Sequence, residues 1–256
     1  MNVLEETLSP ALRDDFDRDG FVILRHFFNA SEVAEFHAEM ERYLRDVAPG
    51  LPPGQVMYEN KERPETLKLM QRLAEHDERL REILYADRVC ALAERLLGLP
   101  IAPQELEWFN KVPRASSATP PHQDGYYFMI EPQEALTMWV ALDPVDEENG
   151  CLRYVRGSNR KGLRPHIRTK VLSFSQGIPD YGPADQQEEI AISAEPGDVL
   201  VHHGLTIHSA HANRSANRQR RSLGLVYYSA RAKQDVACLQ SYQAQVTADW
   251  TRTQKI

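Results

Sequence analysis

The stretch Pro120-Pro121-His122-Gln123-Asp124-Gly125-Tyr126-Tyr127-Phe128 places an imidazole and a carboxylate two residues apart. In an extended strand, residues i and i+2 point to the same face, so His122 and Asp124 are predicted to reach one metal ion together. Zinc and non-haem iron both accept nitrogen and oxygen ligands, and iron(II) oxygenases use two histidines and one carboxylate. The alternative is a strand-end histidine bonded to a nearby aspartate, so a second histidine is needed.

Candidates for the second histidine lie downstream, where His202, His203, His208 and His211 occur within ten positions. His202 and His203 end a predicted strand over 199–203, and His208 and His211 flank the next loop. Metal sites need neutral imidazoles that strands aim inward. The residues alone leave the choice open, and we expect three of the four to be half-exposed strand or loop histidines.

A basic segment, Arg218-Gln219-Arg220-Arg221-Ser222, leads into the last predicted strand. Arg220 and Ser222 share a face by the strand period of two, whereas Arg221 points the other way. A guanidinium fork beside a hydroxyl suits bidentate capture of a carboxylate. The alternative is a solvated surface run of arginines, the usual fate of such a cluster.

The bulk composition bounds the class of protein. A chain of 256 residues with 42% hydrophobic and 26% charged residues is ordinary for one soluble globular domain. The formal net charge of −7 gives no global basic surplus for nucleic acid. Three scattered cysteines indicate neither a disulfide framework nor a zinc ribbon. With no evident signal peptide and no apolar run of membrane-spanning length, we expect a cytoplasmic monomer or small homo-oligomer.

The order of predicted elements indicates an α+β fold. Helices are predicted first, around a strand at 21–24 and a loop at 49–64, over 8–20, 29–47, 66–84 and 87–97. Strands follow, with a loop at 159–187, over 106–112, 122–128, 135–142, 151–155, 189–192, 199–203 and 222–228. The turn Glu148-Asn149-Gly150 predicts a hairpin with 151–155 as its return strand. Such a series of strands commonly closes as a barrel or a double-sheet jelly roll.

Several of these motifs together resemble the phytanoyl-CoA dioxygenase family. They are His122-x-Asp124, a distal His208 followed by Ser209 and Asn213-Arg214-Ser215, and then Arg220. The resemblance extends over nearly the whole chain, in order, through Asp19-Gly20-Phe21-Val22, Asn149-Gly150-Cys151-Leu152 with Gly157-Ser158, and Pro196-Gly197-Asp198 with His203-Gly204. The chain departs from the family at Asn159, where many relatives have histidine, and in a slightly longer spacing from His208 to Arg220.

The resemblance implies a fold and a set of roles. The fold is a double-stranded β-helix, or cupin-like jelly roll, with N-terminal helices packed on the sheet. One domain would span 1–256, with a mainly helical part over 1–100, a jelly-roll core over 101–232 and a C-terminal extension over 233–256. Iron would be bound by His122, Asp124 and His208, and 2-oxoglutarate would be held by Arg220 with Ser222, in a pocket that includes Trp139, Thr137 and Lys111.

The activity that the resemblance implies is Fe(II)- and 2-oxoglutarate-dependent oxidation of a small molecule by dioxygen, with release of succinate and CO2. The product is a hydroxylated, desaturated or ring-closed compound, and the presence of Asp124 disfavours halogenation. Two other activities stay open: hydroxylation of an acyl-CoA, and zinc-dependent hydrolysis, for which no general base is evident and which leaves Arg220 unexplained. A third alternative is a jelly-roll binding domain without catalysis.

A polar natural-product or sugar-containing substrate is favoured over a long-chain acyl-CoA. The acidic chain does not attract polyanionic CoA at long range. Tyr126 and Tyr127 combine flat apolar faces with hydroxyls, which suits a polar ring. Two features favour the opposite choice. Phe174 adds apolar surface for a pocket, and four basic residues suit phosphate: Arg160, Lys161, Arg164 and Arg168.

Overall fold

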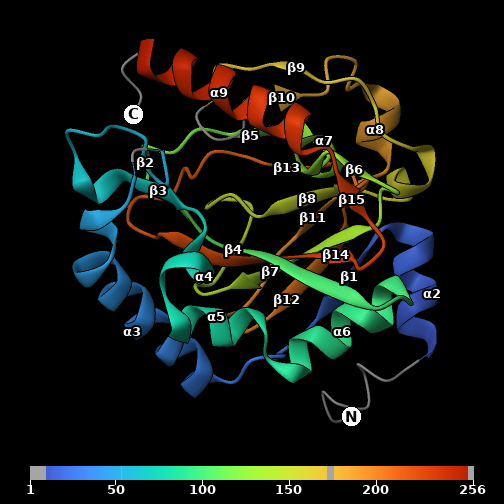
Figure 1. The fold of residues 1–256 in the computed structure, drawn as a ribbon, viewed down its shortest axis with the longest axis horizontal. Helices are drawn as coiled ribbons and strands as arrows, with labels where there is room; N and C mark the ends of the chain where they lie inside the picture. The colour runs from blue at the N-terminus through green and yellow to red at the C-terminus, as the bar shows by residue number, and fades with distance from the viewer. Residues whose placement is uncertain (1–9, 53, 172–175, 253–256) are drawn as a thin grey trace.

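The computed structural model describes residues 10–52, 54–171 and 176–252, which form two facing antiparallel sheets with helices around them (Figure 1). The larger sheet has seven strands. In spatial order they are β1 (Phe21–Leu24), β12 (Val199–His203), β7 (Ala135–Ala141), β14 (Arg220–Ser229), β4 (Ile101–Lys111), β3 (Leu67–Met70) and β2 (Val56–Tyr58).

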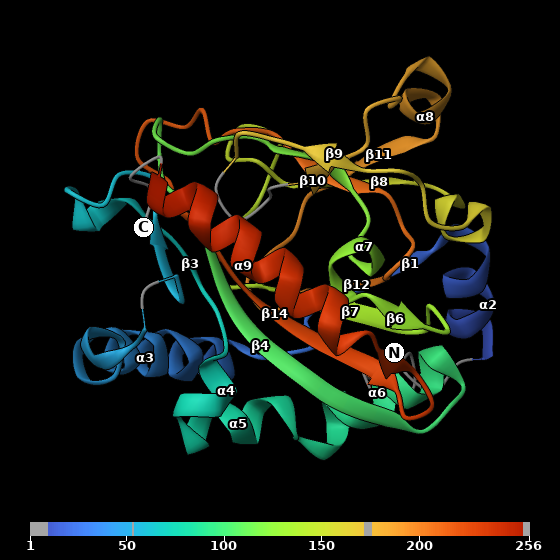
Figure 2. The same cartoon turned by 45° about the horizontal axis from the view of Figure 1, so that its top comes forward.

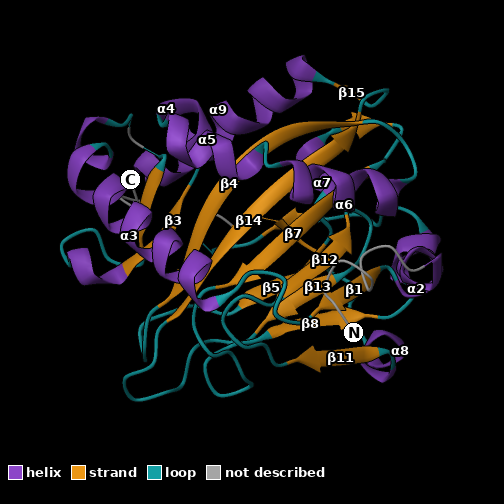
Figure 3. Ribbon diagram, turned by 90° about the horizontal axis from the view of Figure 1, so that it is seen from below, coloured by secondary structure: helices purple, strands orange, loops and turns teal. Residues whose placement is uncertain are grey.

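The smaller sheet has four strands, in the order β11 (Glu189–Ile192), β8 (Leu152–Val155), β13 (His208–Ala210) and β5 (Thr119–His122). Two short pairs lie outside these sheets: β9 (Ile167–Arg168) with β10 (Gln176–Gly177), and β6 (Ile130–Glu131) with β15 (Lys233–Gln234). Figure 3 shows the smaller sheet lying over part of the larger one. The predicted α+β jelly roll is therefore confirmed.

The helices lie on two sides of the sheets. They are α2 (Pro10–Asp19), α3 (Ala30–Asp46), α4 (Leu73–His76), α5 (Glu78–Leu84), α6 (Asp87–Leu97), α7 (Gly125–Phe128), α8 (Pro183–Gln187) and α9 (Val236–Arg252), with single turns η1 (Ala48–Gly50), η2 (Pro64–Thr66) and η3 (Ser158–Lys161). In Figure 1, α9 lies on the opposite side of the molecule from α3, α5 and α6. None of the helices in the described ranges is long and apolar enough to cross a membrane.

Local sequence explains where α3 and α6 begin and end. Asn29 caps α3, because its side chain accepts from the backbone of Glu32 while the Glu32 carboxylate accepts from the backbone of Asn29. Helix α6 ends at Gly98, which adopts the left-handed φ of 66° that glycine allows without strain. Both helices pack on the larger sheet, as predicted.

Side chains along the strands of the larger sheet point alternately to its two faces and form two hydrophobic cores. On β7, Met138 and Val140 face the helices, while Trp139 and Ala141 face the smaller sheet. The second core, between the sheets, also holds Tyr154 of β8. The inner face of the larger sheet is the one that carries the predicted site residues.

The predicted helix over 66–84 is wrong at its start, because Leu67–Met70 is strand β3. Strand β3 pairs with β4 on one side and with β2, inside the predicted 49–64 loop, on the other. Its four residues are all buried, so Leu67 and Met70 match a helical spacing without forming a helix.

The predicted hairpin at Glu148-Asn149-Gly150 is a turn, but the strand pairing is wrong. Gly150 has the left-handed φ of 90° that the turn requires. Strands β7 and β8, however, belong to different sheets. The turn residues thus predict that the chain reverses. They do not predict which strand pairs with the strand that follows the turn.

Two predicted regions have more structure than expected. The 159–187 loop contains η3, β9, β10 and α8 among its described residues, and the predicted C-terminal extension contains β15 and α9. Phe174, a predicted pocket residue, lies outside the described residues.

Asp198 ties the entry of β12 to the end of β1. Its carboxylate is fully buried and accepts from Arg25 Nη1 at 2.6 Å, the His26 backbone N–H at 2.8 Å and the Glu195 backbone N–H at 2.9 Å. His26 has a φ of 52°, a conformation that a non-glycine residue adopts only when its surroundings fix it. Asp198 supplies that fixation.

We expect Asp198→Ala to lower the free energy of unfolding by at least about 1.5–3 kcal/mol, because buried hydrogen bonds to a charged group are lost. Chemical denaturation with the midpoint and slope both fitted measures this change. Glu65→Ala is the control, since its ion pair with Arg63 is exposed and should contribute less than about 1 kcal/mol. Equal effects of the two substitutions would contradict the assignment.

Candidate active site

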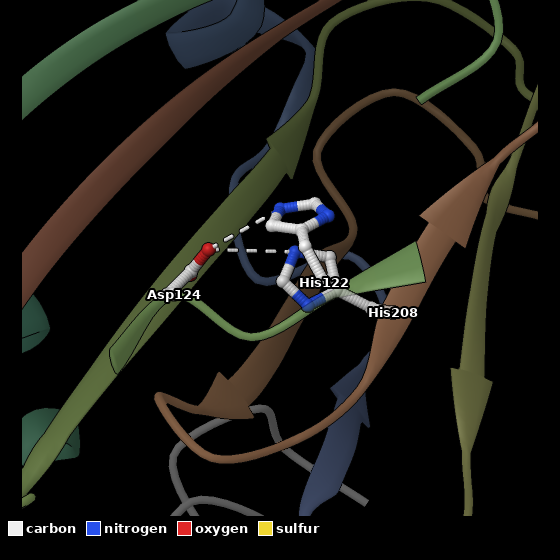
Figure 4. A group of neighbouring side chains, drawn as sticks. All are labelled: His122, Asp124 and His208. Carbon is white, nitrogen blue, oxygen red and sulfur yellow. Dashed lines mark ion pairs between the residues drawn. The ribbon is translucent and has the colours of Figure 1, made fainter. Parts of the chain in front are cut away.

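The two predicted histidine ligands meet across neighbouring strands of the smaller sheet. His122 ends β5, and His208 begins β13 directly opposite it. With Asp124 they form a group whose ligand atoms all lie within 4.8 Å of one another (Figure 4). The Nε2 atoms of both histidines are 3.5 Å from Asp124 Oδ1. The structure therefore brings together the three residues predicted to bind the metal.

Asp124 does not reach this position as part of a strand. The predicted strand over 122–128 is wrong, because β5 ends at His122 and Asp124 adopts helical angles (φ −59°, ψ −34°) before α7. The carboxylate turns toward His122 by way of this bend. The spacing predicted that His122 and Asp124 lie together, although a bend brings them together and not a continuous strand.

The outer nitrogens of the two histidines fix how the rings face the centre. His122 Nδ1 donates to the Pro120 carbonyl at 2.8 Å, and His208 Nδ1 donates to the Thr206 carbonyl at 3.0 Å. A carbonyl only accepts, so each Nδ1 carries the proton and each Nε2 keeps its lone pair toward Asp124. Two imidazole nitrogens and one carboxylate oxygen on one side of a centre fit a divalent transition metal such as iron.

The surroundings of His208 and Asp124 favour the protonation forms that bind a metal. Burial lowers the pKa of His208 well below its usual value, so the ring is neutral at neutral pH. Burial opposes ionisation of Asp124, but the neighbouring side chains of His208, His122 and His202 together lower its pKa well below the usual range. An ionised carboxylate beside the neutral His208 ring binds a cation without first releasing a proton.

Sequence reasoning missed His202. This side chain is only 2% exposed, and its Nε2 donates to Asp124 Oδ2 at 3.0 Å. The expectation that it is a half-exposed strand histidine is wrong, whereas His203 is half-buried and His211 is exposed. His202 shares the inner face of β12 with Leu200, and this period of two was the available signal.

Predicted pocket residue Thr137 also contacts the aspartate. Its hydroxyl donates to Asp124 Oδ2 at 2.7 Å. Thr137 lies directly opposite His202 on the neighbouring strand. Both side chains therefore reach the same carboxylate oxygen from the larger sheet.

Two buried cations lie side by side on the larger sheet. Lys111 of β4 and Arg220 of β14 are cross-strand neighbours, exposed by 6% and 4%. Lys111 Nζ donates to the Ser117 carbonyl at 2.7 Å, and Arg220 Nε donates to the Gly150 carbonyl at 3.1 Å. Neither cation is within 4.0 Å of an acidic side chain in the described part of the chain.

This pairing is electrostatically costly without an anion. Burial lowers the pKa of Arg220 to about 10. Burial, followed by the charge of Arg220, lowers the pKa of Lys111 well below its usual value. Arg220 Nη1 lies 3.5 Å from Ser222 Oγ, and its guanidinium carbon lies 5.2 Å from the Trp139 ring centroid. Four of the five predicted cosubstrate residues thus lie around one buried, positively charged position: Lys111, Arg220, Ser222 and Trp139.

Arg221 has a different environment. Its Nε and Nη2 donate to the Asp143 carboxylate at 2.9 and 2.6 Å, and its side chain is 32% exposed. The strand period therefore places Arg220 inward and Arg221 outward, as predicted.

The comparisons with known proteins agree with this geometry. The family described as phytanoyl-CoA dioxygenase (PhyH) matches residues 16–222. The peroxisomal phytanoyl-CoA dioxygenase of Mus musculus is 26% identical over 218 residues, which cover 79% of this chain and 63% of that protein. The chain thus spans just under two thirds of the length of this curated relative.

Two solved structures are similar over most of both chains. The epimerase SnoN, crystallised with Fe3+, alpha ketoglutarate and nogalamycin RO, is 28% identical, with a TM-score of 0.71 over 90% of this chain and 88% of that one. The non-haem alpha ketoglutarate dependent carbocyclase SnoK from nogalamycin biosynthesis is 26% identical, with a TM-score of 0.71 over 90% and 87%. The chain belongs to the phytanoyl-CoA dioxygenase family.

Proposed function

We propose that this chain is an Fe(II)- and 2-oxoglutarate-dependent oxygenase that hydroxylates or oxidatively cyclises a small polar molecule. The observation that carries the proposal is the combination of two features in one jelly roll: the His122, Asp124 and His208 group, and the buried Lys111–Arg220 pair without a carboxylate partner in the described residues. A metal and a dicarboxylate together satisfy both features.

Each of these side chains has a definite task. His122, Asp124 and His208 hold the metal, with the two rings oriented by the Pro120 and Thr206 carbonyls. When bound, iron and 2-oxoglutarate would let dioxygen oxidise a substrate C–H bond, with release of succinate and CO2.

The cosubstrate would be oriented by the cationic position. Arg220 and Ser222 offer donors to its distal carboxylate. Lys111 adds a second positive charge, and Trp139 covers the guanidinium. A zinc-dependent hydrolase does not require the buried positive charge of Lys111 and Arg220, so that activity does not explain their position.

The substrate class is supported by the inner face of β4. Glu105 and Glu107 lie on the same face as Lys111, by the strand period of two. Gln71 donates to Glu107 at 2.7 Å, while burial and then Glu105 raise the pKa of Glu107 well above its usual value. The charge of Asp124 raises it further. These carboxyl groups offer no positive charge to a polyanionic CoA.

Three of the four basic residues considered for phosphate either form ion pairs or line a cavity separate from the metal group. Arg164 pairs with Asp180 at 2.7 Å and Asp185 at 2.9 Å. Arg160 and Lys161 border a surface cavity of about 440 Å³ that none of the metal-binding residues lines. A phosphate cradle beside the metal group is therefore not supported by these residues.

Aromatic side chains border the metal group and suit a polar ring. The Tyr127 ring is 5.8 Å from that of His122, and its hydroxyl donates to the Gln176 carbonyl at 3.0 Å. Tyr126 stacks on His166 at 4.4 Å. Figures 1 and 2 show α9 close to α7, and its Tyr242 ring is 6.3 Å from that of Tyr127. These aromatic faces favour a ring-containing substrate.

The test is an iron-dependent turnover screen that measures succinate release and substrate oxidation together. We expect stoichiometric oxidation of a polar glycoside or another ring-containing natural product, and only uncoupled succinate release with long-chain acyl-CoA thioesters. Stoichiometric hydroxylation of an acyl-CoA would overturn the substrate class. Zinc content without succinate release would favour the hydrolase. Absence of any bound metal would favour a binding domain without catalysis. A cytoplasmic location and the oligomeric state stay predictions.

A further inference from the structure

The two oxygens of Asp124 have different surroundings. Oδ1 lies 3.5 Å from the Nε2 atoms of His122 and His208, so it faces the metal position. Oδ2 accepts hydrogen bonds from the Thr137 hydroxyl at 2.7 Å and from His202 Nε2 at 3.0 Å. Because a carboxylate oxygen has two lone-pair directions, these two donors occupy Oδ2 fully.

The donors are fixed by the larger sheet. Thr137 and His202 are cross-strand partners on β7 and β12, and both side chains are buried. The two histidines of the metal group belong instead to the smaller sheet. Asp124 is therefore also held by strands that do not contribute a predicted metal ligand.

A third side chain fixes the tautomer of His202. The carboxylate only accepts, so His202 Nε2 carries its proton and Nδ1 has a free lone pair. The Tyr154 hydroxyl, fully buried, donates to that Nδ1 at 3.0 Å. The Tyr154 ring is itself held by stacking on Phe21, with centroids 4.7 Å apart. With a neutral His202 ring, the donations run from tyrosine to histidine to aspartate.

We propose that Thr137 and His202, the latter oriented by Tyr154, are positioning residues that restrict Asp124 to binding the metal through Oδ1 alone. The inference rests on the proposed function and goes beyond it. Carboxylates bind metals through one oxygen or two. In an octahedral site with three protein ligands, a second carboxylate oxygen would take one of the three positions needed for 2-oxoglutarate and dioxygen. The two hydrogen bonds keep that position open.

The test uses Mn(II) bound to the full chain, and water proton relaxation to count the exchangeable waters on the metal. We expect three waters in the wild type. Thr137→Val removes one donor and keeps the side-chain shape, so one lone pair of Oδ2 becomes available to the metal and the count falls to two. Thr137→Ser, the matched control, keeps the hydroxyl and three waters. His202→Phe removes the other donor and should also give two.

The outcomes separate this inference from the proposed function. Two waters in either folded variant, with three in Thr137→Ser, support the positioning role. Three waters in every folded variant overturn it, even where enzyme activity has fallen. A wild-type protein that binds neither Mn(II) nor Fe(II) contradicts the proposed function itself. Circular dichroism identifies the variants that are folded.

Discussion

Replacing His208 with alanine is expected to abolish iron binding and succinate formation while leaving the fold in place. The substitution removes one of the three proposed metal ligands, and we expect no replacement by His202, because its Nε2 already donates to Asp124. The pairing of β13 with β5 and β8 uses backbone groups, which alanine retains. Anaerobic iron titration, succinate release and circular dichroism measure the three quantities. His122→Ala and Asp124→Ala should behave in the same way.

Two control variants make this result specific. His203→Ala removes a half-buried histidine that accepts from the Leu205 backbone N–H and lies outside the metal group. His211→Ala removes an exposed one. Both should retain stoichiometric iron. Full turnover by His208→Ala, with loss of iron in either control, would show that the distal ligand is wrongly assigned.

The second large effect is expected at the cosubstrate position. Arg220→Ala should raise the Michaelis constant for 2-oxoglutarate about ten- to a hundredfold, because a hydrogen-bonded charge pair contributes about 1.5–3 kcal/mol. The measurement is the dependence of the turnover rate on 2-oxoglutarate at saturating iron and substrate.

Arg221→Ala is the matched control for this substitution. Its guanidinium is partly exposed and already bound to Asp143, so the Michaelis constant should stay within about twofold, in line with the small energies of exposed pairs. A large effect at Arg221 with little at Arg220 would mean that the inner face of β14 is misassigned.

The sequence predicted the metal group because its chemistry is concentrated in short motifs. His122 and Asp124 are two residues apart, and the family resemblance selected His208 from four candidates. It did not predict His202 as a partner of Asp124, because that contact depends on the alignment of β12 with β7, where His202 faces Thr137. Such registers arise from the packing of whole sheets, and local spacing contains no information on them.

The same distinction applies to the fold. Helices α3 and α6 were predicted close to their observed bounds, because the residues that cap them are local. Strand β3 was read as a helix because burial on both faces removes the alternation that identifies a strand. The Gly150 turn was predicted, whereas the transfer of β8 to the other sheet was not, since turn residues do not choose the partner strand.

The adjacent cations Lys111 and Arg220 have a consequence for the lifetime of the protein. Without a dicarboxylate, the folded chain keeps these two basic side chains beside each other on neighbouring strands and away from water, which the unfolded chain does not have to do. A ligand that binds only the folded state at a hundred times its dissociation constant adds about 2.7 kcal/mol to stability. Resistance of this enzyme to proteolysis should therefore follow the supply of 2-oxoglutarate, so that a central metabolite sets how much enzyme persists as well as how fast it works.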